Sequence, residues 1–398
     1  MEPRARVLAI STVRDLASAA PWLQGRDVGR LSGAHPSRVL LVQGLGEGDA
    51  ARAAELIEES GGNAARGGDR LVWSATPGAN AILLDRLRHE PMLAAFTGAV
   101  SLSLARWNEP SHDLALPDGR ALLLSQRVHV MGIVNVTPDS FSDGGRFLDP
   151  DTAIEHGLRL ADEGADLLDV GGESTRPGAE PVAAESEADR VVGVVDALAS
   201  KSGIPVSIDT TKTPVARAAL DAGAQILNDV SAGRFDPEMF PLAAERRTPV
   251  VLMHMQGEPR TMQQTPVYGD VVGEITRYLE DRAEAAVAAG IARDKIIVDP
   301  GFGFGKTREH NLVLLRRMRE FRCLGFPILA GTSRKSFVGA VLGDLPVDER
   351  LEGTAATVAL SVANGASIVR VHDVREMARV VRMVEAVQAA VEPGDGRG

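Results

Sequence analysis

Residues 128–145 read VHVMGIVNVTPDSFSDGG, and the fold prediction starts from this segment. Residues 128–134 are largely apolar, as in a strand that is buried on both faces. Residues 135–145 are polar and rich in Ser, Asp and Gly, so the strand ends in a loop that can hold a ligand. The same succession of a short apolar run, a polar group and a helical stretch recurs along the rest of the chain.

These recurrences predict eight strands, at residues 128–135, 166–171, 205–209, 225–229, 249–254, 295–299, 327–331 and 367–372. Amphipathic stretches with helical spacing lie between them, for example at residues 153–163, 185–200, 213–221 and 269–289. Mostly apolar strands that alternate with helices indicate a parallel sheet buried on both faces. The closed form of such a sheet is the (β/α)8 TIM barrel. A hairpin with an Asp118-Gly119 turn is predicted just before the first strand.

The chain length of 398 residues suits a barrel of about 250 residues and a smaller module. Residues 1–112 are rich in Ala and Arg, with strand-like residues 39–42 and 71–73 and helical residues 50–59 and 79–87. We expect a small α+β module of unknown role at residues 1–112, of which residues 106–112 form a linker. The catalytic barrel is expected at residues 113–392, followed by a disordered tail at 393–398.

The composition excludes several classes of protein. A net charge of -11 argues against a nucleic-acid-binding surface and favours small-molecule partners. The single cysteine, Cys323, excludes an intramolecular disulfide framework and fits a reducing compartment. No apolar stretch approaches the roughly 20 residues of a membrane helix, and charged residues interrupt the N-terminus. We therefore expect a soluble, cytoplasmic protein.

Active sites of TIM barrels lie at the C-terminal ends of the strands. Every predicted strand places a polar or charged group there: Asn135; residues 171–176; Asp209; Asn228 and Asp229; His254; Asp299; Ser333, Arg334 and Lys335; and Arg370 and His372. For residues such as Ser333, capping of the following helix is a good alternative explanation of why a polar side chain occurs there. It explains Asp209, Asp299 and Arg370 poorly, because they lie at or beside the last residue of a strand.

Asp209, Asn228 and Asp299 suit a flat heterocycle with an N–C–N edge. A carboxylate accepts two parallel N–H bonds, and an amide satisfies a mixed donor and acceptor edge. Binding of a transition metal is the competing interpretation, but no His has the spacing that would complete such a site. A cationic rim that suits phosphate or pyrophosphate is expected from Asn135, Arg176, Arg370 and His372.

Residues 299–306 read DPGFGFGK, and with Thr307 they end like a phosphate-binding P-loop. A P-loop would require Gly at position 300, where this chain has Pro, so this motif is excluded. Only five of the 43 basic residues are Lys, and three of them, Lys212, Lys306 and Lys335, follow strand ends closely. A lysine there can act as a compact charge beside anionic or carbonyl groups.

Seven motifs in this order resemble those of the dihydropteroate synthase family, across residues 113–390. They are MGIVNVTPDSFSDGG (131–145), GGESTRPG (171–178), SIDT (207–210), NDV (228–230), DPGFGFGK (299–306), TSRKS (332–336) and RVHD (370–373). The resemblance implies condensation of 6-hydroxymethyl-7,8-dihydropterin diphosphate with 4-aminobenzoate, which gives 7,8-dihydropteroate and pyrophosphate. It also implies Mg2+ as cofactor, a homodimer, and inhibition by sulfonamides that mimic the aminobenzoate.

The resemblance assigns a role to each matching residue. The pterin is expected to contact Asp209, Asn228, Met253, Asp299 and Lys335, with Arg370 stacked over it. The diphosphate and its Mg2+ are expected at Asn135, Asp143, Arg370 and His372. The aminobenzoate site is expected from Phe141, Thr175, Arg176, Pro177, Phe304 and Ser336. Lys335, Arg370, His372 and Asp209 are the expected catalytic residues.

Two alternatives remain open at this stage. A methyltetrahydrofolate corrinoid methyltransferase would share the Asp/Asn/Asp set, but should lack the Gly-rich loops and the SRKS motif that this chain has. A non-catalytic pterin-binding homologue would be favoured if one of the motif residues were replaced. The sequence also leaves open whether the acceptor is 4-aminobenzoate or a larger arylamine.

Overall fold

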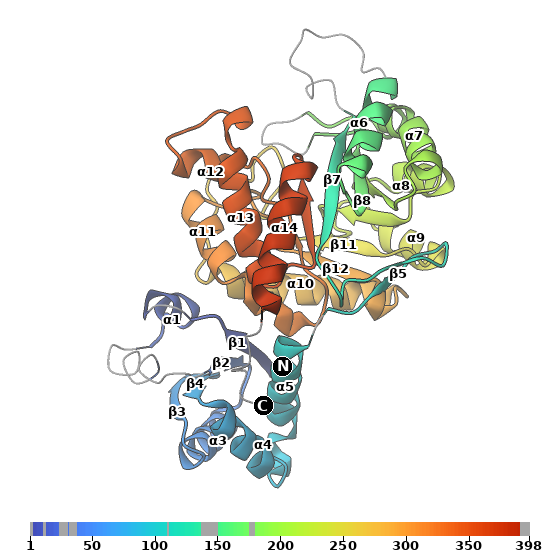
Figure 1. The fold of residues 1–398 in the computed structure, drawn as a ribbon. Helices are drawn as coiled ribbons and strands as arrows, with labels where there is room; N and C mark the ends of the chain where they lie inside the picture. Colours follow the sequence, from blue (N-terminus) through green and yellow to red (C-terminus); the bar gives the residue numbers. More distant parts are fainter. Residues whose placement is uncertain are drawn as a thin grey trace, which may run out of the picture. The chain divides into compact units, whose positions relative to one another are not determined.

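The computed structural model describes residues 3–10, 13–23, 31, 38–109, 111–136, 150–174 and 180–390. The chain divides into two compact units (Figure 1). The first unit comprises Met1–Pro110, Tyr268–Thr276 and Arg316–Gly325, and the second comprises Ser111–Val267, Arg277–Leu315 and Phe326–Gly398. The first unit therefore includes two segments from the C-terminal half of the chain.

The first unit is built on an antiparallel sheet of order β1-β2-β4-β3. Alternate residues of β2 point to opposite faces, so Leu40 and Val42 belong to one apolar cluster and Val39 and Leu41 to another. The first cluster also contains Cys323, which is buried as a small apolar residue would be. The strands are β1 (Arg4–Leu8), β2 (Arg38–Gln43), β3 (Asn63–Gly67) and β4 (Arg70–Ala75). The helices are α1 (Val13–Ala19), α3 (Glu47–Glu59), α4 (Pro77–Leu87), η1 (Pro91–Leu93), α5 (Ala94–Asn108) and η4 (Met318–Leu324).

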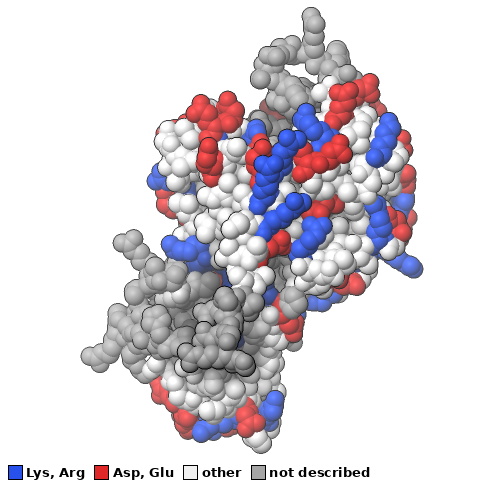
Figure 2. All heavy atoms as spheres, viewed as in Figure 1, with Lys and Arg blue, Asp and Glu red and all other residues white. Residues whose placement is uncertain are grey.

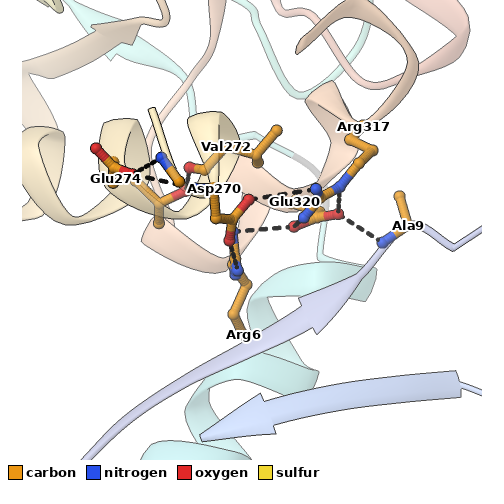
Figure 3. A network of polar contacts seen from close by, with 9 residues as sticks. Arg6, Ala9, Asp270, Val272, Glu274, Arg317 and Glu320 are labelled. Carbon is orange, nitrogen blue, oxygen red and sulfur yellow. Dashed lines mark hydrogen bonds and ion pairs between the residues drawn. The ribbon is translucent and has the colours of Figure 1, made fainter. Parts of the chain in front are cut away.

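A network of buried charges lies in the first unit (Figure 3). The guanidinium of Arg317 donates to both carboxylate oxygens of Glu320, at 2.7 and 3.0 Å, and to Asp270 Oδ1 at 3.3 Å. Arg6 on β1 donates to Asp270 Oδ2 at 2.6 Å and lies 3.2 Å from Glu320 Oε2, and the backbone N–H of Ala9 donates to Glu320 Oε1. Two guanidinium groups thus balance two carboxylates that come from segments far apart in the sequence.

The second unit is a nearly closed barrel of eight parallel strands in the order β12-β11-β10-β9-β8-β7-β14-β13. A parallel bridge between Val298 and Ile328 connects β12 to the segment before β13. The predicted (β/α)8 TIM barrel is therefore confirmed. The strands are β7 (His129–Asn135), β8 (Leu167–Gly171), β9 (Val206–Asp209), β10 (Ile226–Asp229), β11 (Val250–Met253), β12 (Ile296–Asp299), β13 (Leu329–Ala330) and β14 (Ile368–Val371).

Helices follow the strands along the chain (Figure 1). They are α6 (Pro150–Asp162), α7 (Ala184–Lys201), α8 (Thr213–Asp221), α9 (Met239–Arg246), α10 (Val271–Ala288), η3 (Arg293–Lys295), α11 (Arg308–Arg316), α12 (Ser336–Val341), η5 (Val347–Glu349), α13 (Leu351–Ala363) and α14 (Val374–Ala389). Four of them correspond to the predicted helical stretches. No helix within the described residues is both long and apolar enough to cross a membrane.

An apolar layer closes the N-terminal end of the barrel. The predicted hairpin is present as β5 (Leu114–Ala115) and β6 (Ala121–Leu122), and its four leucines pack against inward-facing strand residues. These strand residues are Met131, Leu167, Ile226, Val251, Ile297, Leu329 and Ile368. The layer leaves the C-terminal end of the strands as the open end of the barrel interior.

Figure 2 shows Lys and Arg side chains lying among Asp and Glu side chains on the face of the barrel that is in view. The basic residues on this face do not form a separate patch. Acidic and basic side chains are therefore intermixed on the face in view.

Candidate active site

A polar layer follows the apolar layer of the barrel, toward the C-terminal ends of the strands. Side chains alternate along a strand, so the residue two positions after each apolar-layer residue also points inward. On five strands this residue is Asp169, Asn228, Met253, Asp299 or Arg370. On four of these strands the barrel interior therefore changes from Leu or Ile to a carboxylate, an amide or a guanidinium within one layer.

Arg370 connects two strands of this layer through its guanidinium. Its Nε donates to Asp169 Oδ2 at 2.6 Å, and its Nη2 donates to Asp209 Oδ2 at 2.8 Å. Asn228 Nδ2 donates to the same oxygen of Asp169 at 2.9 Å. Three of the predicted site residues, Arg370, Asp209 and Asn228, are thus joined in one network.

Asp169 belongs to this network, although the sequence analysis did not select it. Its side chain is completely buried, and Oδ1 has no hydrogen-bond partner among the described residues. The paired residue on β9, Ser207, is also buried and its Oγ is likewise unpartnered in the described structure. Asp169 lies inside β8, away from the strand ends at which the site residues were expected. The signal that would have found it is its spacing of two from Leu167.

Burial raises the pKa of two carboxyl groups in the layer. The pKa of Asp209 rises to about 7 because of burial, supported by the neighbouring Asp169 and opposed by Arg370. Burial raises the pKa of Asp299 to about 6, against the hydrogen bond from the Gly301 N–H and the charge of Lys335. Both groups therefore change protonation near neutral pH, which is unusual for carboxyl groups and typical of functional sites.

The loop after β12 is held by a buried lysine. Lys306 Nζ donates to the carbonyl oxygens of Gly301 at 2.8 Å and Phe304 at 2.9 Å, and contacts His254 Nδ1 at 3.0 Å. Burial lowers the pKa of Lys306 to about 7 and the pKa of His254 well below its usual value. His254, which was expected as a polar group at a strand end, thus contacts the lysine that holds this loop.

This loop places Phe304 beside two predicted pterin residues. Phe304 is buried in an apolar cluster with Met253, and Lys335 Nζ lies 4.2 Å from the centre of its ring. Gly301 has a φ of +69°, and a Cβ at this position would lie 2.0 Å from the carbonyl oxygen of His254. Only glycine therefore allows the loop to approach β11 so closely.

The remaining predicted residues lie at the same end of the barrel. Asn135 is the last residue of β7, and Lys335 and exposed Ser336 begin α12. His372 follows β14, with its Nδ1 3.0 Å from Ser333 Oγ. The predicted residues Phe141, Asp143, Thr175, Arg176 and Pro177 lie outside the described residues.

A cavity of about 390 Å³ opens at the ends of β8, β9 and β10. Its lining includes Asp209, Lys212, Val230, Phe235 and Arg260. Lys212 forms ion pairs with Glu173 and with the buried Glu187, so its charge is neutralised within the protein. Asp209 lines this cavity and also bonds Arg370, so it connects the cavity to the polar layer.

The chain matches the family model "Pterin binding enzyme" over residues 131–372. It is 46% identical over 273 residues to the dihydropteroate synthase of Synechocystis, an alignment that covers 68% of this chain and 94% of that protein. The dihydropteroate synthase of Yersinia pestis, solved with a sulfonamide drug, matches with a TM-score of 0.67 and 45% identity over 70% of this chain and all of that one. The Xanthomonas albilineans enzyme, solved with 4-aminobenzoic acid, matches with a TM-score of 0.66 and 47% identity over 71% of this chain and all of that one.

The first 110 residues lie outside the family match, while the whole polar layer lies inside it. The relatives are nearly completely covered by the barrel of this chain. The chain belongs to the pterin-binding enzymes and, among them, to the dihydropteroate synthases, which are transferases of folate biosynthesis.

Proposed function

We propose that this chain condenses 6-hydroxymethyl-7,8-dihydropterin diphosphate with 4-aminobenzoate, and that its polar layer binds the pterin. The observation that supports this most strongly is the set of buried carboxylates around Arg370 at the open end of the barrel. Asp299 and Asp209 can accept N–H bonds from the amidine-like edge of the ring, and Asn228 can satisfy a mixed edge. Met253 and Lys335 complete the proposed pterin site.

The proposed chemistry is a displacement at the CH2 carbon of the pterin. The amine nitrogen forms a C–N bond while the C–O bond to the diphosphate breaks, and the electron pair leaves with pyrophosphate. The amine proton is released to water. An arylamine is already nucleophilic, so the main task is to stabilise the departing charge and to align the reactants. We assign the first task to Arg370 and His372.

The donor set at the end of β7 fits Mg2+. No group of three or more His, Cys, Asp and Glu side chains within the described residues could hold a metal ion by itself. Mg2+ commonly takes one or two protein oxygens, with the remaining positions filled by water and substrate phosphate. We propose the side-chain oxygen of Asn135 as one such ligand and Asp143 as the second. Bound there, Mg2+ would neutralise charge on the diphosphate.

We further propose that the acceptor lies between Phe304 and the start of α12. Phe304 is a buried apolar ring beside Met253 and Lys335, and Ser336, which follows Lys335, is exposed. Phe141, Thr175, Arg176 and Pro177 are proposed to complete this site. The 4-aminobenzoic acid in the Xanthomonas albilineans structure supports the same acceptor here.

A homodimer is proposed through helices α12–α14, which lie side by side in Figure 1. Several large apolar side chains on these helices are exposed, including Leu360 at 51%, Met383 at 65% and Val387 at 63%. Exposed apolar side chains grouped on neighbouring helices favour an interface. A second copy of the chain is the partner that we propose for this surface. A monomer in sedimentation analysis at micromolar concentration would contradict it.

The pH dependence of pterin binding tests the role of Asp299. Because its pKa is raised to about 6, the carboxylate is present above pH 6 and is protonated below it. The neutral acid can no longer accept two N–H bonds, so affinity should fall as the pH drops. From pH 7.5 to pH 5 we expect the dissociation constant, measured by calorimetry, to rise about tenfold.

The variant Asp299→Asn provides the control, since the diphosphate of the ligand also titrates. At pH 7.5 this variant should bind the pterin diphosphate less tightly by roughly 1–3 kcal/mol, because an N–H donor would face a ring N–H. The ratio of wild-type to variant affinity should shrink toward pH 5. A ratio that stays constant over this range would refute the assignment of Asp299.

A further inference from the structure

Arg334 and Asp373 form an ion pair that joins two adjacent loops at the open end of the barrel. Arg334 Nε donates to Asp373 Oδ2 at 2.9 Å, and Arg334 Nη2 donates to Asp373 Oδ1. Both contacts come from the planar edge of one guanidinium, a geometry that fixes orientation as well as distance. Arg334 lies between β13 and α12, and Asp373 lies between β14 and α14.

The backbone of Arg334 is held in an uncommon conformation. Its φ is +55°, in the left-handed region that L-residues with long side chains rarely adopt. Its N–H donates to Thr354 Oγ1 at 3.0 Å, and its carbonyl oxygen accepts from Arg350 Nη1 at 3.0 Å. Strained backbone persists where the surroundings fix it, and here two side chains and the ion pair do so.

Two residues beside this ion pair, Lys335 and His372, are among those to which the proposed function assigns roles. Ser333 precedes Arg334, and its Oγ lies 3.0 Å from His372 Nδ1 and accepts from the His372 N–H at 3.2 Å. Lys335 follows Arg334, with its Nζ over the Phe304 ring. The two loops are thus joined twice, by Ser333 with His372 and by Arg334 with Asp373.

We propose that Arg334 and Asp373 are positioning residues that hold Lys335 and His372 in their working geometry. This inference rests on the proposed function, because it takes the roles of Lys335 and His372 from it. The guanidinium and the carboxylate bond to each other, so the pair acts through its neighbours and not by contact with the reactants. Its loss should leave the polar layer inside the barrel intact and allow the two loops to shift.

The test compares Arg334→Gly, Asp373→Asn and a control in single-turnover kinetics, with enzyme in excess over the pterin diphosphate. Glycine adopts the left-handed conformation freely, so Arg334→Gly removes the ion pair without adding backbone strain. Asp373→Asn keeps the shape of the side chain and removes its charge. The matched control is Arg375→Ala. Arg375 is an exposed arginine on α14, and its Nη2 lies 3.4 Å from Glu163 Oε1.

With enzyme in saturating excess, the single-turnover rate constant reports the geometry of the bound complex. The fraction of folded enzyme is measured separately, by titrating the binding sites with the pterin diphosphate. We expect the rate constants of Arg334→Gly and Asp373→Asn to fall by roughly 10- to 100-fold, the range associated with misplacement of about 1 Å. Their affinity for the pterin diphosphate should change less than about threefold, because the polar layer is unchanged. Arg375→Ala should keep the wild-type rate constant.

Rate constants within about twofold of wild type in both variants, with a reduced fraction of folded enzyme, would overturn the inference and leave the pair a purely structural role. A drop of the same size in Arg375→Ala would also overturn it. The wild-type reaction separates this failure from that of the proposed function. If the wild-type chain forms no dihydropteroate, the proposed function fails. If it does so and the variants keep their rates, only the positioning role fails.

Discussion

Replacing Arg370 by Lys is expected to lower kcat/KM by roughly 10²- to 10³-fold, the effect of losing a donor that stabilises developing charge. The guanidinium of Arg370 bonds Asp169 and Asp209 at the same time. A single ammonium group cannot reproduce this fork. The two carboxylates would then lie near each other with less neutralising charge. The pKa of Asp209, already raised to about 7, should rise further, so residual activity should shift toward higher pH.

The control for this experiment is Arg379→Lys, since Arg379 is exposed on α14. Steady-state kinetics of both variants from pH 6 to pH 9 would measure the effect. Activity of Arg370→Lys within threefold of wild type would show that any cation suffices at this position, contrary to the assigned role.

Replacing Arg317 by Met is expected to lower the unfolding free energy of the first unit by about 3–5 kcal/mol. The cost is that of removing one partner from a buried set of charges. Arg317 and Glu320 are fully buried, and three of the hydrogen bonds in Figure 3 come from Arg317. The substitution leaves two carboxylates with Arg6 as the remaining cation of the network.

Tryptophan fluorescence during denaturant unfolding measures this change selectively, because Trp22, Trp73 and Trp107 all belong to the first unit. The matched control is Arg86→Met, which removes an exposed ion pair with Glu59 in the same unit. Exposed pairs contribute about 0–1 kcal/mol, so the control should change little. Equal effects of the two substitutions would mean that the buried network contributes no more than a surface pair.

The barrel could be predicted from the sequence because its strands are short apolar runs buried on both faces. All eight predicted strands overlap observed ones, although β13 has only two residues, Leu329–Ala330, where 327–331 was predicted. The first unit was harder. β1 (RARVL) and β3 (NAARG) lack the apolar runs that identify strands, so they were not predicted. Strand pairing with β2 and β4 forms them.

The predicted linker at residues 106–112 is wrong in its first part. Helix α5 continues to Asn108, because Trp107 packs against the core of the first unit and its carbonyl oxygen accepts from Arg322. The partners of this helix lie more than 200 residues away in the sequence. For the same reason, the inclusion of Tyr268–Thr276 and Arg316–Gly325 in the first unit could not be anticipated from local patterns.

The site was predictable where its residues end a strand. Asp209, Asn228, Asp299 and Arg370 stand out because each interrupts or ends an apolar run. The local signal for Asp169, which lies inside a strand, is its spacing of two from Leu167. The ion pair of Arg334 with Asp373 requires knowledge of which strands are neighbours. Pairing of β8 with β9, and the proximity of the loops after β13 and β14, become visible only in the folded barrel.

The proposed reaction is tested by incubating the full chain with the pterin diphosphate, Mg2+ and labelled 4-aminobenzoate. We expect labelled 7,8-dihydropteroate and one pyrophosphate for each molecule formed, with product formation strongly reduced in Arg370→Lys. Absence of labelled product from folded wild-type protein that binds the pterin diphosphate would contradict it.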